Sequence, residues 1–154
     1  MASGREKVRM SPEEVEQLLM SCSKVQVATI NPDGSPHLTT LFHVVHEGRL
    51  AFWTYPSSQK VKNLERDPRL CCLVEDGEQY FDLRGVSIQG TARIVTDKAE
   101  VREIGTAVAR RVAGGADLGE AGKVEIERQV ARRVAVVVTP RATASWDHRK
   151  MLAG

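Results

Sequence analysis

The sequence predicts an antiparallel β-barrel with flanking helices, mainly β within the α+β class. Five or six short segments rich in β-branched residues are separated by turn signals, with no alternation of strand and helix as in a βαβ chain. Two helical patterns come late, at about residues 98–113 and 123–132. With 154 residues, 42% hydrophobic and 27% charged, the chain has the size and balance of one folded domain.

The N-terminal region divides into a polar segment and a helix. Residues 1–10 contain basic side chains but no apolar core, so we expect a flexible tail and not a signal peptide. Ser11 and Glu14 have the spacing of a capping box, and an apolar face follows. We therefore expect a helix over residues 11–22 and assign residues 11–154 to a single domain.

Three strands should follow as a meander. Residues 25–30 are rich in β-branched side chains and end at the turn signal of residues 31–34. The next strand is expected over residues 37–45. A turn at residues 47–48 then leads to an apolar strand over residues 50–55.

A short helix interrupts the strands before two more follow. It opens near Ser57 and stops at residues 67–68, because the residue before a proline is held out of the α region. Strands are expected over residues 70–74 and 86–94. In the second, even positions are apolar or glycine and odd positions are polar, so one face should be buried, and Gly90 should mark a bulge or a sharp bend.

The last elements are the two late helices and a final strand. The strand, residues 134–138, is apolar on both faces and should lie deep in the sheet. The apolar stripe of the first late helix is expected to consist of Val101, Ile104, Ala107, Val108 and Val112.

Composition and spacing exclude several classes of function. A net charge of +2 without a basic run argues against a nucleic-acid binder, and no apolar stretch is long enough to span a membrane. The chain has 3 cysteines, an odd number that does not indicate a set of disulfides and that fits a reducing cytoplasm. His43 and His46 lie three apart on a strand and point to opposite faces, so we expect no metal site.

The segment from Ser57 to Asn63 has the features of a phosphate site. A helix start offers unpaired backbone N–H groups, and here hydroxyls and lysines accompany it. Lys60 and Lys62 are about 200° apart on a helix, so Lys60 should lie beside the core and Lys62 in solvent. The alternative is an ordinary capped surface helix with solvated lysines.

The C-terminal segment of residues 145–150 is the second candidate. From Arg132 to Lys150 there are five Lys or Arg against one Asp. Trp146 and His148 could line a groove whose cations meet an anionic ligand. Alternatively, Trp146 anchors a solvated charged tail on the core.

The order of these motifs resembles the pyridoxamine 5'-phosphate oxidase-like superfamily, whose fold is the FMN-binding-like split antiparallel β-barrel. Within it, the chain is most similar to the actinobacterial branch that uses the deazaflavin coenzyme F420. The resemblance covers about residues 11–152 and rests on the segments at 28–37, 58–69, 84–93 and 145–150. It implies a cytoplasmic homodimeric oxidoreductase with a cofactor at the subunit interface, which transfers a hydride between F420 and an unidentified small-molecule substrate.

The resemblance also implies roles for individual residues. Lys60 would hold the coenzyme phosphate, with Ser58 and Thr54 as hydroxyl donors. The strand from Pro36 to Phe42 would run along the ring, and the family pattern favours Thr40 over Thr39. Residues also expected at the cofactor are Asn63, Trp146 and Lys150, with His148 as the candidate proton donor.

Three alternatives to this function stay open. The first is an FMN-dependent oxidoreductase of the same superfamily, and the second is a non-catalytic protein that binds or carries the deazaflavin. Oxidation of a vitamin B6 phosphate is the third, since substrates do not transfer reliably within a fold. The cationic excess near the C-terminus favours the deazaflavin, because this coenzyme carries a phosphodiester and an oligoglutamate tail.

Overall fold

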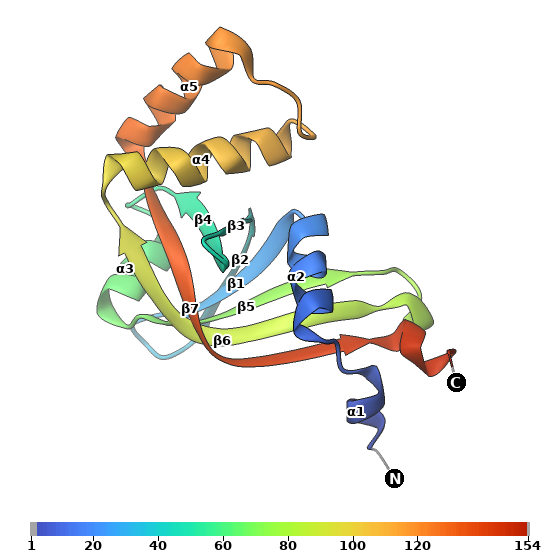
Figure 1. The fold of residues 1–154 in the computed structure, drawn as a ribbon. Coiled ribbons are helices and arrows are strands. Elements are labelled where there is room, and N and C mark those ends of the chain that lie inside the picture. Colours follow the sequence, from blue (N-terminus) through green and yellow to red (C-terminus); the bar gives the residue numbers. More distant parts are fainter. Residues whose placement is uncertain (1–2, 154) are drawn as a thin grey trace.

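A computed structural model describes residues 3–153, which form one curled, seven-stranded antiparallel sheet with five α-helices (Figure 1). The order of strands across the sheet is β2-β1-β5-β6-β7-β4-β3. The strands are β1 (Lys24–Ile30), β2 (Pro36–Phe42), β3 (Val44–His46), β4 (Arg49–Thr54), β5 (Arg69–Asp76), β6 (Arg84–Val95) and β7 (Val134–Asp147). The helices are α1 (Gly4–Val8), α2 (Pro12–Ser21), α3 (Gln59–Arg66), α4 (Lys98–Val112) and α5 (Gly119–Arg132), with 3-10 turns η1 (Tyr80–Asp82) and η2 (His148–Met151). The predicted split antiparallel barrel of the α+β class is confirmed.

Two apolar cores hold the sheet in shape. The first fills the inside of the curl, where side chains from β1, β4, β5, β6 and β7 meet those of α2 and α3. The second lies outside the curl, where α4 and α5 cover β3, β4 and the start of β7 (Figure 1). The outward side chains of β1, β5 and β6 belong to neither core and stay partly exposed. We call this open surface the outer face.

The N-terminal segment is folded from Ser3 onward, in contrast to the flexible tail expected for residues 1–10. Ser3 caps α1 through a capping box with Glu6. Val8 and Met10 are both buried, and the Met10 backbone N–H donates to Ser145 Oγ at 3.2 Å. The contacts that hold this segment come from the far end of the chain, which a local pattern does not reveal.

Two expected strands have different limits in the structure. The strand expected over residues 37–45 breaks at His43 into β2 and β3, and the buried His43 ring contacts the Leu19 carbonyl at 3.0 Å. The final strand extends beyond residue 138 to Asp147 because β6 continues to pair with it. As predicted, residues 134–138 are buried in the sheet, between β6 and β4.

Gly90 marks the predicted bulge in the β6–β7 ladder. Gln89 pairs with Ala142 and Gly90 with Pro140, so Arg141 has no partner opposite it. A Cβ atom at position 90 would collide with the Thr139 carbonyl oxygen, which explains the glycine.

The apolar stripe of α4 differs in part from the expected one. Val101, Ile104 and Val108 are buried, but Ala107 is exposed and Val112 is 58% exposed. Gly105 lies on the buried face instead, directly against the ring of Trp53. The helix packs on the sheet around this close approach, and Val112 faces away from it.

Among residues 3–153, no helix is both long enough and apolar enough to cross a membrane. The same part of the chain contains no group of three or more His, Cys, Asp or Glu side chains placed to hold a metal ion.

Candidate functional site

Helix α3 closes one end of the curled sheet and brings polar side chains into it. The helix follows Pro56, has Ser58 as its N-cap and ends at Asp67, before Pro68. Its buried face carries Lys60, Val61, Asn63 and Leu64, as the helical spacing predicts. Leu64 joins the inner core, and the polar residues of this face lie beside it.

Lys60 is the buried cation of this end of the barrel. Its side chain is only 8% exposed, and Nζ lies 3.4 Å from Thr54 Oγ1. No carboxylate of the described chain pairs with it. Burial lowers the pKa of the ammonium because desolvation disfavours the charged form. A buried charge without a partner is costly, so the site is suited to an anion.

The side chain of Ser58 adds a second group without a partner. Its Oγ is buried, makes no capping hydrogen bond and has no partner in residues 3–153. Thr54, Ser58 and Lys60 together form what we call the Lys60 site. Two hydroxyls, an ammonium and the start of a helix are the groups that bind a phosphate.

Lys62 and Asn63, the other two α3 residues considered in the sequence analysis, have different surroundings. Lys62 is exposed, as expected from its position on the helix. Asn63 is fully buried, and its amide nitrogen donates to Thr29 Oγ1 at 3.1 Å and Asn31 Oδ1 at 3.0 Å. Its oxygen accepts from Gln59 at 2.9 Å. Asn63 therefore ties α3 to β1, and its amide is occupied by protein partners.

The structure distinguishes the two threonines of β2. Thr39 pairs with the buried Val27 and faces the inside of the curl, whereas Thr40 pairs with Gln26 and points to the outer face. Thr39 Oγ1 is buried and has no hydrogen-bond partner among residues 3–153.

His37 was not singled out from the sequence, although it shares the inward face of β2. Its Nδ1 is also buried without a partner in the described chain. His37 pairs across the strands with Thr29, which Asn63 of α3 contacts. The inward side of β2 thus presents polar groups near α3. The alternation along β2, in which Leu41 packs against the inner core, could have indicated that His37 and Thr39 face inward as well.

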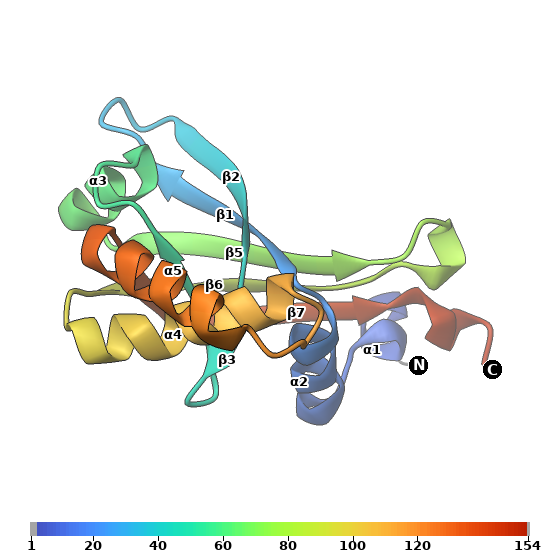
Figure 2. The same ribbon diagram turned by 90° about the horizontal axis from the view of Figure 1, so that it is seen from above.

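The C-terminal motif lies at the other end of the molecule. Figures 1 and 2 place α3 and η2 on opposite sides. Thr54 pairs with Val134 at the start of β7, whereas Trp146 lies near its end, roughly 40 Å away along an extended strand. One subunit therefore does not bring the Lys60 site and the C-terminal motif together.

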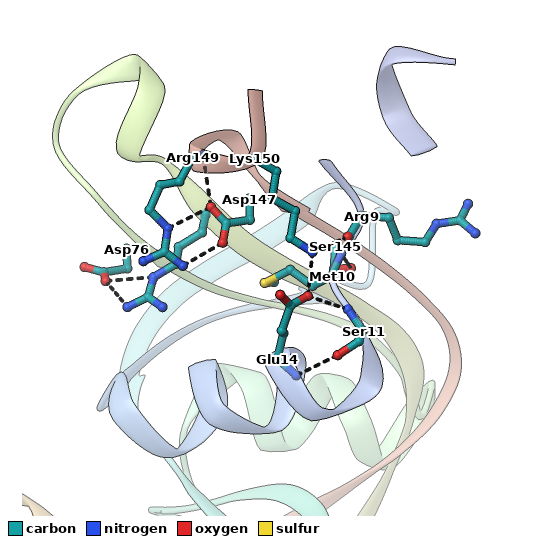
Figure 3. Close-up of polar contacts among 10 residues, drawn as sticks. Arg9, Met10, Ser11, Glu14, Asp76, Ser145, Asp147, Arg149 and Lys150 are labelled. Carbon is teal, nitrogen blue, oxygen red and sulfur yellow. Dashed lines mark hydrogen bonds and ion pairs between the residues drawn. The ribbon is translucent and has the colours of Figure 1, made fainter. Parts of the chain in front are cut away.

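The charged groups of this motif already have partners (Figure 3). Lys150 Nζ donates to Glu14 Oε2 at 2.6 Å and to the Arg9 carbonyl at 2.8 Å. Arg149 makes a bidentate pair with the buried Asp147, and the pKa of that carboxyl is lowered mainly by these hydrogen bonds. Lys150, which was expected at the cofactor, is thus held by Glu14 and the Arg9 backbone within this subunit.

Two aromatic residues of the motif have structural contacts as well. The ring of Trp146 lies directly against Gly85 on the neighbouring strand, where a Cβ atom would clash with it. His148 Nδ1 is 2.7 Å from the carbonyl of Tyr80, and the two rings are tilted against each other at 4.8 Å. Trp146 remains half-buried.

Two cavities lie on the outer face, at positions that the sequence analysis did not identify. One, of about 280 Å³, is lined by residues that include Ile30, Arg69, Gln89 and Arg141. The other, of about 330 Å³, includes Lys24, Gln26, Thr40 and Arg84. Neither contains a residue of the Lys60 site. We give more weight to the Lys60 site, because it combines a buried cation that no described carboxylate pairs with and a buried hydroxyl without a partner in the described chain.

Comparison with known proteins agrees with the fold. The sequence model of the pyridoxamine 5'-phosphate oxidase family matches residues 11–147. A conserved hypothetical protein, Rv2991 from Mycobacterium tuberculosis, is 38% identical with a TM-score of 0.89; the match covers 97% of this chain and 92% of that one. A protein described as an F420 reductase is 25% identical with a TM-score of 0.66, over 87% of this chain and 98% of that one.

More distant structures share the architecture. The heme storage protein HutZ from Vibrio cholerae is 15% identical with a TM-score of 0.67, over 87% of this chain and 94% of that one, which shows the fold alone. No curated protein matches this sequence significantly. The family match spans most of the chain and includes every strand of the sheet. The chain belongs to the pyridoxamine 5'-phosphate oxidase family.

Proposed function

We propose that this protein is an oxidoreductase that binds coenzyme F420 and transfers a hydride between it and a small organic substrate. The observation that carries the proposal is the Lys60 site. A buried ammonium without a carboxylate and a buried hydroxyl without a partner fit the phosphate of such a coenzyme. Similarity to an F420 reductase supports the choice of coenzyme.

Each polar group near α3 has a role in this proposal. Lys60, Ser58 and Thr54 would hold the phosphate. Thr39 and His37 would offer the ring of the coenzyme their free polar atoms, so Thr39 replaces Thr40 as the β2 ligand. When bound, the coenzyme supplies the hydride chemistry. The protein's own part is to bind, to orient and to exclude water.

We infer that the protein acts as a homodimer. The outer face is uncovered in one subunit, and the C-terminal motif is too far from the Lys60 site of the same subunit to share a ligand with it. A partner packed on the outer face could bring its own Trp146 and His148 toward the ring, with His148 as the candidate proton donor. A cytoplasmic location fits the three free cysteines, Cys22, Cys71 and Cys72.

A flavin mononucleotide enzyme is the second candidate, because this cofactor also carries a phosphate that the Lys60 site would accept. The experiment that separates an enzyme from a carrier is an anaerobic acceptor screen. Protein loaded with reduced F420 is mixed with quinones, enones and nitro compounds, and oxidation of the coenzyme is followed by its fluorescence. We expect protein-dependent oxidation by at least one class. Tight coenzyme binding without any such turnover would instead support the carrier.

A further inference from the structure

A second cationic group, which was not part of the family pattern, lies at the same end of β4 as the Lys60 site but on the other face of the sheet. Arg133 follows α5 directly and extends between two aromatic rings. Its Cζ is 4.7 Å from the ring centroid of Trp53 and 4.3 Å from that of Tyr55. Nε donates to Gln129 at 3.0 Å, and one terminal nitrogen donates to the Tyr55 hydroxyl at 3.2 Å. The guanidinium is therefore held in one orientation before any ligand arrives.

The charge of Arg133 is not neutralised within the described chain. No carboxylate of residues 3–153 pairs with it, in contrast to Arg69, Arg84 and Arg149, which each make a salt bridge. A second cation adds to the local field, since Lys98 Nζ donates to the Arg133 carbonyl at 3.0 Å. These contacts use only part of the guanidinium, which has five N–H donors. The remaining donors can meet an anion.

Arg133 and the Lys60 site lie at the same end of β4, on opposite faces of the sheet. Val134, the next residue, pairs with Thr54, which contacts Lys60. Tyr55 follows Thr54 and begins the turn that leads into α3. Figures 1 and 2 both show α3 and the C-terminal end of α5 on the same side of the molecule. The two cations thus flank the end of β4.

We propose that Arg133, held by Trp53 and Tyr55, binds a carboxylate in the tail of the coenzyme beyond the phosphate that Lys60 holds. The inference rests on the proposed function and extends it. A guanidinium fork matches the two oxygens of a carboxylate, and the tail of F420 carries several carboxylates. Arg133 takes the role expected of the C-terminal cations, because Lys150 is bound to Glu14. It would therefore be a specificity residue for the tailed coenzyme over flavin mononucleotide.

The test compares Arg133→Gln with Arg132→Gln, a change of the neighbouring, exposed arginine. Fluorescence titrations use F420 with its oligoglutamate tail and flavin mononucleotide. Arg133→Gln should weaken F420 binding about tenfold, or about 1.4 kcal/mol, and change flavin mononucleotide binding by less than about twofold. Arg132→Gln should change either affinity by less than about twofold.

The outcomes separate the two proposals. Unchanged F420 affinity in Arg133→Gln, with a loss in Lys60→Ala, would overturn the tail site and leave the Lys60 site standing. Equal losses for both cofactors would also overturn it, because they indicate a structural effect. Arg133→Lys, which keeps the charge but loses the planar guanidinium, provides a second variant and should recover only part of the F420 affinity. Failure of the wild-type protein to bind F420 would overturn the proposed function together with the tail site.

Discussion

Replacing Lys60 with methionine should reduce coenzyme binding without reducing stability. The ammonium is buried, contacts only a hydroxyl among the described residues and has a pKa lowered by desolvation. Methionine has a similar length and no charge, so Lys60→Met removes the cost of burying the cation and keeps most of the packing. A residue kept for function and not for the fold should behave in this way.

The magnitudes follow from the two roles of the ammonium. Loss of a charge-assisted contact to phosphate costs about 1.5–3 kcal/mol, or roughly 10- to 100-fold in affinity. The free energy of unfolding of the apo-protein should stay equal or rise by up to about 1 kcal/mol. The same substitution should therefore weaken coenzyme binding and leave the stability of the apo-protein equal or higher.

The assay combines a fluorescence titration with urea unfolding of the same preparation. Lys62→Met is the matched control, since Lys62 is on the same helix but exposed, and it should change affinity by about twofold or less. Normal coenzyme binding by Lys60→Met would refute the phosphate assignment. A loss of more than about 1 kcal/mol of stability would show instead that the lysine supports the fold.

Three further predictions concern acid stability, the N-terminal segment and assembly. Burial lowers the pKa of His43 from 6.5 to about 4, so the native state resists protonation and stability should fall as the pH drops from about 6.5 to 4. This difference in pKa corresponds to roughly 3 kcal/mol of unfolding free energy. In urea unfolding across this pH range, the stability of His43→Gln should depend less on pH than that of the wild type. An equal pH dependence would contradict the assignment of this effect to His43. Lys150→Met removes the contacts to Glu14 and the Arg9 carbonyl, so the Met10 amide should exchange with deuterium faster. The free energy of unfolding should fall by about 0.5–1 kcal/mol. Unchanged exchange would mean that other contacts hold the N-terminal segment. Light scattering should give about twice the 17.0 kDa monomer mass, and a monomer at micromolar concentration would exclude the interface cleft.

Features that depend on local periodicity could be predicted from the sequence. The alternation along β6 and the bulge at Gly90 were expected, because each follows from a few neighbouring residues. The burial of Lys60 and the exposure of Lys62 likewise follow from the helical repeat. For the same reason, the capping box of α2 formed as predicted.

Features that depend on distant partners could not be predicted in this way. Lys150 pairs with Glu14 near the other end of the chain, and no pattern around either residue reveals the contact. The second half of β7 contains Pro140 and few apolar residues, and only pairing with β6 makes it a strand. The choice between Thr39 and Thr40 is a choice of strand face, which the pairing with β1 determines. Arg133 was counted only as part of a charge excess, because its aromatic partners come from β4 and the residue after it.

The measurement that tests the central claim most directly is a titration of the apo-protein with F420 and with flavin mononucleotide, at low and high salt. We expect F420 to bind at least about tenfold more tightly, a difference of about 1.4 kcal/mol. The preference should shrink at high salt, because salt screens the partly exposed Arg133 that we propose meets the tail. Tighter binding of flavin mononucleotide, or a purified protein that is yellow with retained flavin, would contradict the choice of coenzyme. Binding of neither cofactor at tens of micromolar would contradict the redox function as a whole.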